Sequence, residues 1–124
     1  MSKTQFLEEN LKSGEIYAGL VLGMDEKPDE HLVLLPGNVV GVSWEKAVEW
    51  ADSIGGRLPT RQELSILFAN CKPHLIKRWH WSCETHESDA SLAWVCHFYD
   101  GIQDYGHKGY EGAAVAVRTI QLSA

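Results

Sequence analysis

Long apolar runs are missing from this sequence, and none approaches the roughly 20 residues that a membrane-spanning helix needs. The first ten residues include Lys3 but no apolar stretch, so we expect no secretory signal peptide. Internal repeats and low-complexity tracts are absent as well. What is present is an ordinary globular composition over 124 residues, 44% of them hydrophobic and 23% charged. This composition indicates one folded domain and excludes a disordered or fibrous chain.

Lysine and arginine are also scarce. The chain has 11 of them against 17 acidic residues, which gives a formal net charge of −6 at pH 7. Proteins that bind nucleic acids or anionic membranes need a basic face. We interpret the one basic cluster, Lys72, Lys77 and Arg78, as a solvated surface. The sequence therefore predicts neither a nucleic acid nor a membrane as a partner.

Cysteine is sparse, and its pattern carries no pairing signal. The three cysteines are Cys71, Cys83 and Cys96, and no C-x-x-C motif occurs. This pattern is typical neither of a zinc site nor of a disulfide framework, and it suits a reducing compartment. The histidines likewise follow no known metal-ligand spacing. We therefore expect no bound metal and no cofactor.

Two helices are predicted with defined boundaries in the first half of the chain. Ser43 is a good N-cap for a helix with apolar residues at helical spacing, which ends before Gly55. Thr60 and Glu63 form the S/T-x-x-E capping box, so a second helix begins at Arg61. A weaker apolar spacing predicts a further short helix near the N-terminus, over residues 4–12.

Strand signals occupy most of the remaining chain. Apolar runs at 15–23 and 31–36 predict a hairpin whose strands are covered on both faces. Further strands are expected at 92–99, 102–105 and 113–120, the first two joined by a turn at Asp100-Gly101. Because the strands do not alternate with the helices, this order indicates an α+β fold. The chain then divides into an N-terminal arm or short helix (1–14) and a single domain (15–124).

A set of short motifs in fixed order resembles a known family. The motifs are Ser43-Trp44-x-x-Ala47, Gly56-Arg57-Leu58-Pro59-Thr60-x-x-Glu63-Leu64, Trp81-Ser82-x-Glu84, Ala93-Trp94, Phe98-x-x-Gly101 and Val117-Arg118. From about Gly14 to Ile120 they resemble the Lcl C-terminal domain family, a domain of unknown function common in phage, prophage and bacterial surface proteins. The segment before the second helix is also distantly similar to the formylglycine-generating, sulfatase-modifying domain.

Both groups belong to the C-type-lectin-like superfamily. The resemblance therefore implies two helices packed against antiparallel β-sheets, with the termini close together on neighbouring strands. It also implies a phage or prophage origin and a place in the bacterial cytoplasm or a phage particle. Two family chemistries are not carried over. No cysteine follows Cys96 to supply the formylglycine-generating pair, and the calcium motifs of sugar-binding lectins do not occur.

Six residues are interpreted as structural. Thr60 caps a helix, Pro59 fixes the chain that enters it, and Trp44 belongs to an apolar helix face. We expect Arg57 to pair with a buried carboxylate such as that of Glu63 or Glu84. Arg118, flanked by small residues in the last strand, is expected to pair with another acid. The six are Trp44, Arg57, Pro59, Thr60, Glu63 and Arg118.

Two aromatic and polar clusters are the candidate binding residues. Tryptophan beside a carboxylate suits a sugar or a cation, and tyrosine in Gly-rich loops gives a large contact area at low entropic cost. Two alternatives stay open: that Trp81 belongs to the core, and that the second cluster is an ordinary solvated hairpin. The candidates are Trp79, Trp81, Glu84, His97, Tyr99, Asp104, Tyr105, His107 and Tyr110.

Three functions follow from these patterns. The first is a non-enzymatic binding module that recognises a protein or a glycan through the loops at 79–89 and 99–112. The second is a phage structural or assembly protein that forms homo-oligomers through its N-terminal arm and strand edges. The third and least favoured is an enzyme related to the formylglycine-generating group, in which Cys83 or a histidine is essential. A separate possibility is a nucleophilic pair of Cys83 with His97 or His107. No catalytic residue is assigned.

Overall fold

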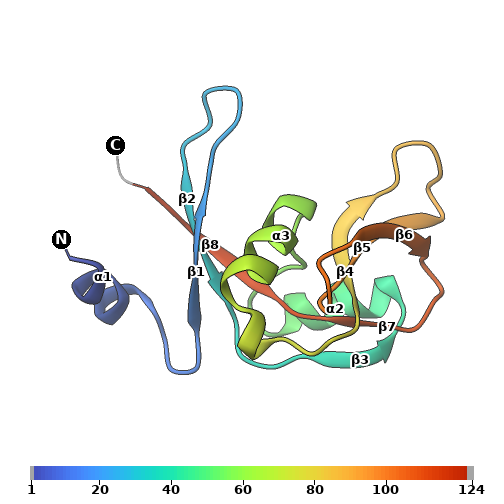
Figure 1. The fold of residues 1–124 in the computed structure, drawn as a ribbon, viewed down its shortest axis with the longest axis horizontal. Coiled ribbons are helices and arrows are strands. Elements are labelled where there is room, and N and C mark those ends of the chain that lie inside the picture. The colour runs from blue at the N-terminus through green and yellow to red at the C-terminus, as the bar shows by residue number, and fades with distance from the viewer. Residues whose placement is uncertain (1, 123–124) are drawn as a thin grey trace.

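Helices and strands of a computed structural model, which describes residues 2–122, are shown in Figure 1. The helices within these residues are α1 (Lys3–Asn10), α2 (Trp44–Ser53) and α3 (Arg61–Asn70), followed by the short 3-10 helix η1 (Lys72–His74). The strands are β1 (Ile16–Val21), β2 (Glu30–Leu34), β3 (Val39–Val42), β4 (Trp79–Thr85), β5 (Leu92–His97), β6 (Gln103–His107), β7 (Gly112–Ala114) and β8 (Val117–Gln121).

Two sheets share these strands. The small sheet has the order β1-β2-β8 and is antiparallel. The large sheet has the order β3-β7-β4-β5-β6, in which β4 and β7 form a parallel pair and the others are antiparallel. This arrangement confirms the predicted α+β class and the predicted β1–β2 hairpin.

The helix boundaries follow from the capping residues that the sequence predicts. The Ser43 hydroxyl accepts the Lys46 N–H at the start of α2. At α3 the capping box is complete: Glu63 N–H donates to the Thr60 hydroxyl at 3.1 Å, and Thr60 N–H donates to the Glu63 carboxylate at 2.9 Å. Both predicted helices are confirmed, because these bonds satisfy backbone donors that have no partner inside a helix.

The core has two parts, one under each of the long helices. α3 packs against β1, β4 and β5, and α2 packs against β3, β4 and β7. The first part centres on five fully or almost fully buried residues: Leu32, Leu64, Leu67, Phe98 and Val117. The second centres on Ala47, Ala51, Leu58, Trp81 and Ala114. In Figure 1, α3 lies between the small sheet and the β4–β6 part of the large sheet.

The predicted strand over 113–120 is wrong in one respect. The chain leaves the large sheet after β7 and enters the small sheet at β8, so Val115 and Ala116 join two strands. Both residues are buried, so the apolar run gives no sign of the break. The strands β3 and β4 were not predicted. The expected loop at 79–89 is corrected, because its residues 79–85 form β4 and pair with β5 and β7. Gly56 sits beside the crossing point, where a Cβ atom would lie 2.8 Å from the Val117 carbonyl oxygen.

Coverage of the hairpin differs between its two strands. β2 is buried on both faces through Leu32, Val33 and Leu34, as predicted. β1 is not, because it is the edge strand of the small sheet and Leu20 on it is 47% exposed. Leu22 at the tip is also exposed. The expectation that both strands are covered on both faces is therefore corrected for β1.

The N-terminal helix folds back on the small sheet. The ring centroids of Phe6 on this helix and His31 on β2 are 4.2 Å apart. Arg118 on β8 fastens the end of the helix: it donates to the Asn10 carbonyl at 2.8 Å and to both oxygens of Glu15 at 2.8 and 2.9 Å. The acid predicted for Arg118 is thus Glu15. The helix ends at Asn10, two residues earlier than expected, where this contact begins.

The first and last strands are not neighbours. β2 lies between β1 and β8 and pairs with both. The resemblance implied termini on neighbouring strands, and this expectation is corrected. The reason is the β1–β2 hairpin, which places its second strand next to the last strand of the chain. Among the described residues, no helix is both long enough and apolar enough to cross a membrane.

Candidate binding surface

The Arg-Leu-Pro-Thr segment is built into the fold. The Arg57 guanidinium donates to both oxygens of Glu63 at 2.6 and 2.8 Å. Burial alone would raise the pKa of the Glu63 carboxyl, but hydrogen bonds from Arg57 and Thr60 outweigh it and hold that pKa below its usual value. This confirms Glu63 as the partner of Arg57.

Two candidate binding residues serve the fold instead. Trp81 is fully buried, and its indole N–H donates to the Val42 carbonyl at 3.1 Å. Its assignment as a partner contact is therefore wrong, and it belongs to the core. Glu84 accepts the Arg61 backbone N–H at 2.7 Å, at the positive end of α3. Its carboxylate stabilises that helix, and we assign it to the fold.

Three other candidates come together around one hollow in the large sheet. Trp79 of β4 is paired with His97 of β5. Their ring centroids are 4.9 Å apart, in an edge-to-face arrangement. Tyr110, from the loop before β7, lines the same hollow of about 410 Å³. The segments at 79–89 and 99–112 therefore meet here, since β4 lies between β7 and β5. We call this the aromatic hollow; its walls are Gly41, Lys77, Arg78, Trp79, His97, Tyr110, Glu111, Gly112 and Ala113.

Charge and exposure around the aromatic hollow suit a contact surface. Tyr99 is 63% exposed and Tyr110 is 55% exposed. The Lys77 ammonium lies 5.5 Å from the centre of the Tyr99 ring. Within residues 2–122, neither Lys77 nor Arg78 forms an ion pair with a carboxylate. The hollow therefore combines exposed aromatic rings with two free cations, in a chain whose net charge is −6.

A second cluster lies on the other face of β5 and β6. Trp94 is paired with Tyr105 across these strands, and their rings meet at 5.6 Å. His86 stacks against Trp94 at 5.5 Å, and the Arg61 guanidinium lies 3.6 Å above the same indole. Tyr105 is half exposed. Successive residues of a strand face opposite ways, so Tyr105 is separated from the aromatic hollow by the sheet.

The last two candidates lie on β6. Asp104 is exposed, is paired with Val95, and accepts the Tyr105 N–H at 2.8 Å. His107 ends the strand opposite Leu92. Trp94, His86 and Arg61 were not among the binding residues predicted from the sequence. Pairing β5 with β6 through the Asp100-Gly101 turn places Trp94 opposite Tyr105, and that signal was available.

A catalytic cysteine has little support from the geometry. Cys83 is free and exposed, yet the surrounding protein desolvates its thiol and raises its pKa, against a weaker lowering by Arg57. A neutral thiol is a poor nucleophile. In the part of the chain described, no imidazole is hydrogen-bonded to Cys83. Residues 2–122 also contain no group of three His, Cys, Asp or Glu side chains placed to hold a metal ion.

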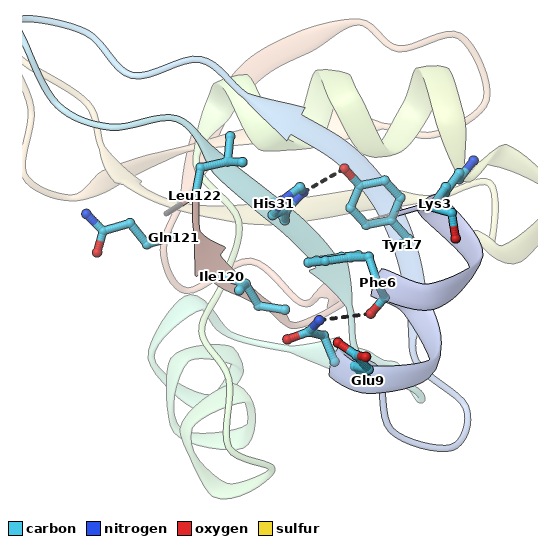
Figure 2. A pocket seen from close by; sticks show the side chains of 10 residues that line it. Lys3, Phe6, Glu9, Tyr17, His31, Ile120, Gln121 and Leu122 are labelled. Carbon is cyan, nitrogen blue, oxygen red and sulfur yellow. Dashed lines mark hydrogen bonds between the residues drawn. The ribbon is translucent and has the colours of Figure 1, made fainter. Parts of the chain in front are cut away.

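A larger hollow of about 670 Å³, which no sequence pattern predicted, lies between α1 and the small sheet (Figure 2). The Tyr17 hydroxyl and His31 Nδ1 are hydrogen-bonded at 2.8 Å, and the Phe6 ring lies beside both rings. Burial raises the pKa of Tyr17, so its hydroxyl stays protonated. The walls are Ser2, Lys3, Phe6, Glu9, Asn10, Tyr17, His31, Ile120, Gln121 and Leu122.

Comparison of this chain with models of known families and with curated protein sequences gives no match.

Proposed function

We propose that this chain is a non-enzymatic binding module that recognises a protein or a glycan through the aromatic hollow. The observation that carries this proposal is the convergence of Trp79, His97 and Tyr110 on one hollow. These residues come from three separate parts of the chain, and each keeps a ring at the surface of the hollow. Concave sites with a few aromatic and polar groups are the usual form of a ligand site.

The support beneath the hollow favours a preformed site. Trp79 and His97 stand on paired strands at the centre of the large sheet. Trp81, the next residue on the same face of β4, is fixed in the core. A rigid base lowers the entropic cost of binding, because the rings need little ordering when the partner arrives.

The charges indicate what the partner presents to the hollow. Lys77 and Arg78 supply cationic donors, and Glu111 is the one acidic wall residue. Unpaired cations beside aromatic rings favour carboxylate or other acceptor-rich groups. The module therefore recognises an acidic or acceptor-rich patch of its protein or glycan partner.

The origin proposed for this module follows the family resemblance. We assign the domain to a C-type-lectin-like fold of the Lcl C-terminal domain type, encoded by a phage or prophage. It acts in the bacterial cytoplasm or a phage particle. Two helices packed against largely antiparallel sheets, together with the capped Arg-Leu-Pro-Thr segment, support this assignment.

The test is capture of a partner from bacterial lysate and cell-envelope fractions, and from a glycan array. A Tyr99→Ala/Tyr110→Ala variant removes two exposed rings. The matched control, Leu22→Ala/Met24→Ala, removes two exposed side chains at the far hairpin. We expect the parent and the control to retain the same partner and the tyrosine variant to lose it. Equal capture by all three proteins would exclude the aromatic hollow as the binding site.

A second candidate function is assembly of a phage particle through homo-oligomers. Leu20, Leu22 and Met24 favour it, because these exposed apolar side chains gather along the edge strand β1 and the hairpin tip. Light scattering after size exclusion distinguishes the two functions. An oligomer that becomes a monomer in Leu22→Lys would support assembly, and a monomeric parent would reject it.

A further inference from the structure

Three histidines close three turns in the same way. In each case the ring Nδ1 accepts the backbone N–H of the residue two positions later. His86 accepts from Ser88 at 3.1 Å, His97 accepts from Tyr99 at 3.1 Å, and His107 accepts from Gly109 at 3.0 Å. Asparagine and aspartate close turns in this manner, and here imidazole takes the place of their side-chain oxygen.

Two of these turns position exposed tyrosines: Tyr110 in the wall of the aromatic hollow, and Tyr99 beside its wall residues Lys77 and His97. The His97 turn carries Tyr99 and is closed again by the Gly101 N–H, which donates to the His97 carbonyl at 2.8 Å. The His107 turn leads into Tyr110, whose N–H donates to the His107 carbonyl at 2.9 Å. The His86 turn begins the polar loop that follows β4.

The accepting role fixes the chemical state of the rings. A neutral imidazole has one acceptor nitrogen and one N–H, whereas a protonated imidazole has two N–H donors and no acceptor. Because Nδ1 accepts, the proton of each neutral ring is on Nε2. A second proton must add at Nδ1, where it meets the backbone N–H of the turn. Protonation therefore replaces a hydrogen bond with a contact between two donors.

We propose that these three histidines make the binding surface pH-sensitive, in that their neutral forms hold the turns and their protonation opens them. Histidine is the side chain that ordinarily exchanges its proton between about pH 5 and 8. Protonation at Nδ1 of His97 and His107 releases Tyr99 and Tyr110 from their fixed positions. The inference rests on the proposed function, since it describes the regulation of that same site.

The charged neighbours of these rings come from several elements. Glu87 Oε2 lies 3.6 Å from His86 Nε2, and Asp89 interacts electrostatically with both His86 and His107. Hydrogen bonds from Ser91 lower the pKa of Asp89, so it is a carboxylate throughout the range. The groups that share the hollow with His97 are Lys77, Arg78 and Glu111, and its ring neighbours are Trp79 and Tyr99.

Another histidine provides an internal contrast. His80 is fully buried, and its Nδ1 is 2.8 Å from the Arg78 carbonyl oxygen. Burial lowers its pKa to about 4, and the nearby His97 adds a smaller lowering. Its ring nitrogen faces a backbone carbonyl and accepts no backbone N–H, so His80 closes no turn of this kind.

The matched variants are His86→Asn, His97→Asn and His107→Asn, combined in one protein. Asparagine retains an acceptor for the N–H two residues later but does not titrate. The corresponding triple alanine variant removes the acceptor at every pH. Histidine ¹⁵N shifts give the tautomers, and the {¹H}–¹⁵N NOE of residues 86–91, 97–101 and 107–111 gives the order of the turns.

At pH 8 we expect the Nε2–H tautomer at all three turn histidines and ordered turns in the parent. At pH 5 the NOE values of the three turns should fall in the parent, remain high in the asparagine variant, and be low at both pH values in the alanine variant. An Nδ1–H tautomer at pH 8, or turns that stay ordered in the fully protonated parent, would overturn the proposal.

Capture at two pH values separates this proposal from the proposed function. His97 lines the aromatic hollow, so this test uses a variant with only His86→Asn and His107→Asn. We expect the parent to retain its partner at pH 7.5 and release it at pH 5.5, and this variant to retain more of the partner than the parent at pH 5.5. Equal release by both proteins at pH 5.5 would overturn regulation by the turns. If the parent captures no partner at either pH, the proposed function fails, and the NMR result still decides whether histidines hold the turns.

Discussion

The two terminal nitrogens of the Arg57 guanidinium donate to the two carboxylate oxygens of Glu63, at 2.6 and 2.8 Å. The Glu63 side chain is 4% exposed, and the Arg57 side chain is 43% exposed. The pair joins the segment between α2 and α3 to the first turn of α3. The same carboxylate also accepts the Thr60 N–H, so one buried acid fixes both the loop and the helix start.

Loss of this carboxylate should therefore lower stability more than loss of a surface acid. We expect Glu63→Gln to reduce the free energy of unfolding by about 2 kcal/mol, the scale of a hydrogen bond to a charged group. The loss is not larger because solvent screens the exposed part of Arg57. Urea denaturation at pH 7 measures it. Glu49→Gln, on the exposed face of α2, is the control and should change stability by less than about 0.5 kcal/mol.

The buried histidine predicts acid sensitivity in a defined window. The native pKa of His80, about 4, is below the value of 6.5 for an unperturbed side chain. Between these values the unfolded state binds the proton and the native state does not, so stability falls as pH drops from 6.5 to 4. The expected loss is about 3 kcal/mol. Denaturation at several pH values measures it, and His80→Leu should flatten the curve in this window.

Acidic groups extend this loss to lower pH. The native pKa values of Glu63 and Glu15 are lowered below 4.5, so their contributions are complete above that pH and disappear as pH falls through the native values. Melting temperature against pH should therefore keep falling below pH 4.5. Glu63→Gln should reduce the slope there without changing the His80 window. An unchanged slope would show that Glu63 titrates alike in both states.

The cap of α3 gives a local test of the helix boundary. Thr60→Ala removes the hydroxyl that accepts the Glu63 N–H, and we expect a loss of about 1 kcal/mol. Thr60→Ser keeps the oxygen and should lose much less. Thermal or urea unfolding of the two variants side by side gives the comparison, and equal stability would place the helix start elsewhere.

A substitution at Arg118 tests how the N-terminal helix is held, because it leaves the sequence of that helix unchanged. Arg118→Ala removes the bonds to Glu15 and to the Asn10 carbonyl, so we expect α1 to leave the small sheet. Limited proteolysis should then cut near residues 8–14 at least about tenfold faster, the change expected for about 1.4 kcal/mol. Arg61→Ala, on α3, is the control and should leave that rate unchanged.

Local signals account for the parts of the fold that the sequence predicted. The capping hydrogen bonds of Ser43 and Thr60 join residues only three positions apart, so the sequence alone predicts where both helices begin. Arg118 was expected to meet an acid, but its partner Glu15 lies at the other end of the chain and no local pattern identifies it. The break at Val115 was hidden, because the residues around it are apolar in either sheet.

The candidate site was predicted only in part, because some of its contacts are local in the sequence and others join distant segments. Strand alternation put His97 on a defined face, and pairing with β4 brings Trp79 beside it. Trp81 has the same residue type and strand as Trp79 but is buried, since its position lies deeper under α2. Arg61 over Trp94 depends on the packing of α3 against β5, which a single sequence does not reveal.

The crossing of the chain from β7 to β8 has a consequence for the order in which the protein forms. Both sheets receive a strand from residues 112–121, and β2 pairs through Glu30 with Gln121. During synthesis the β1–β2 hairpin therefore leaves the ribosome long before its third strand exists. Such distant pairing slows folding and leaves a strand edge uncovered in the meantime. Until β8 is made, the β2 edge of this hairpin is open to chaperones and to self-association.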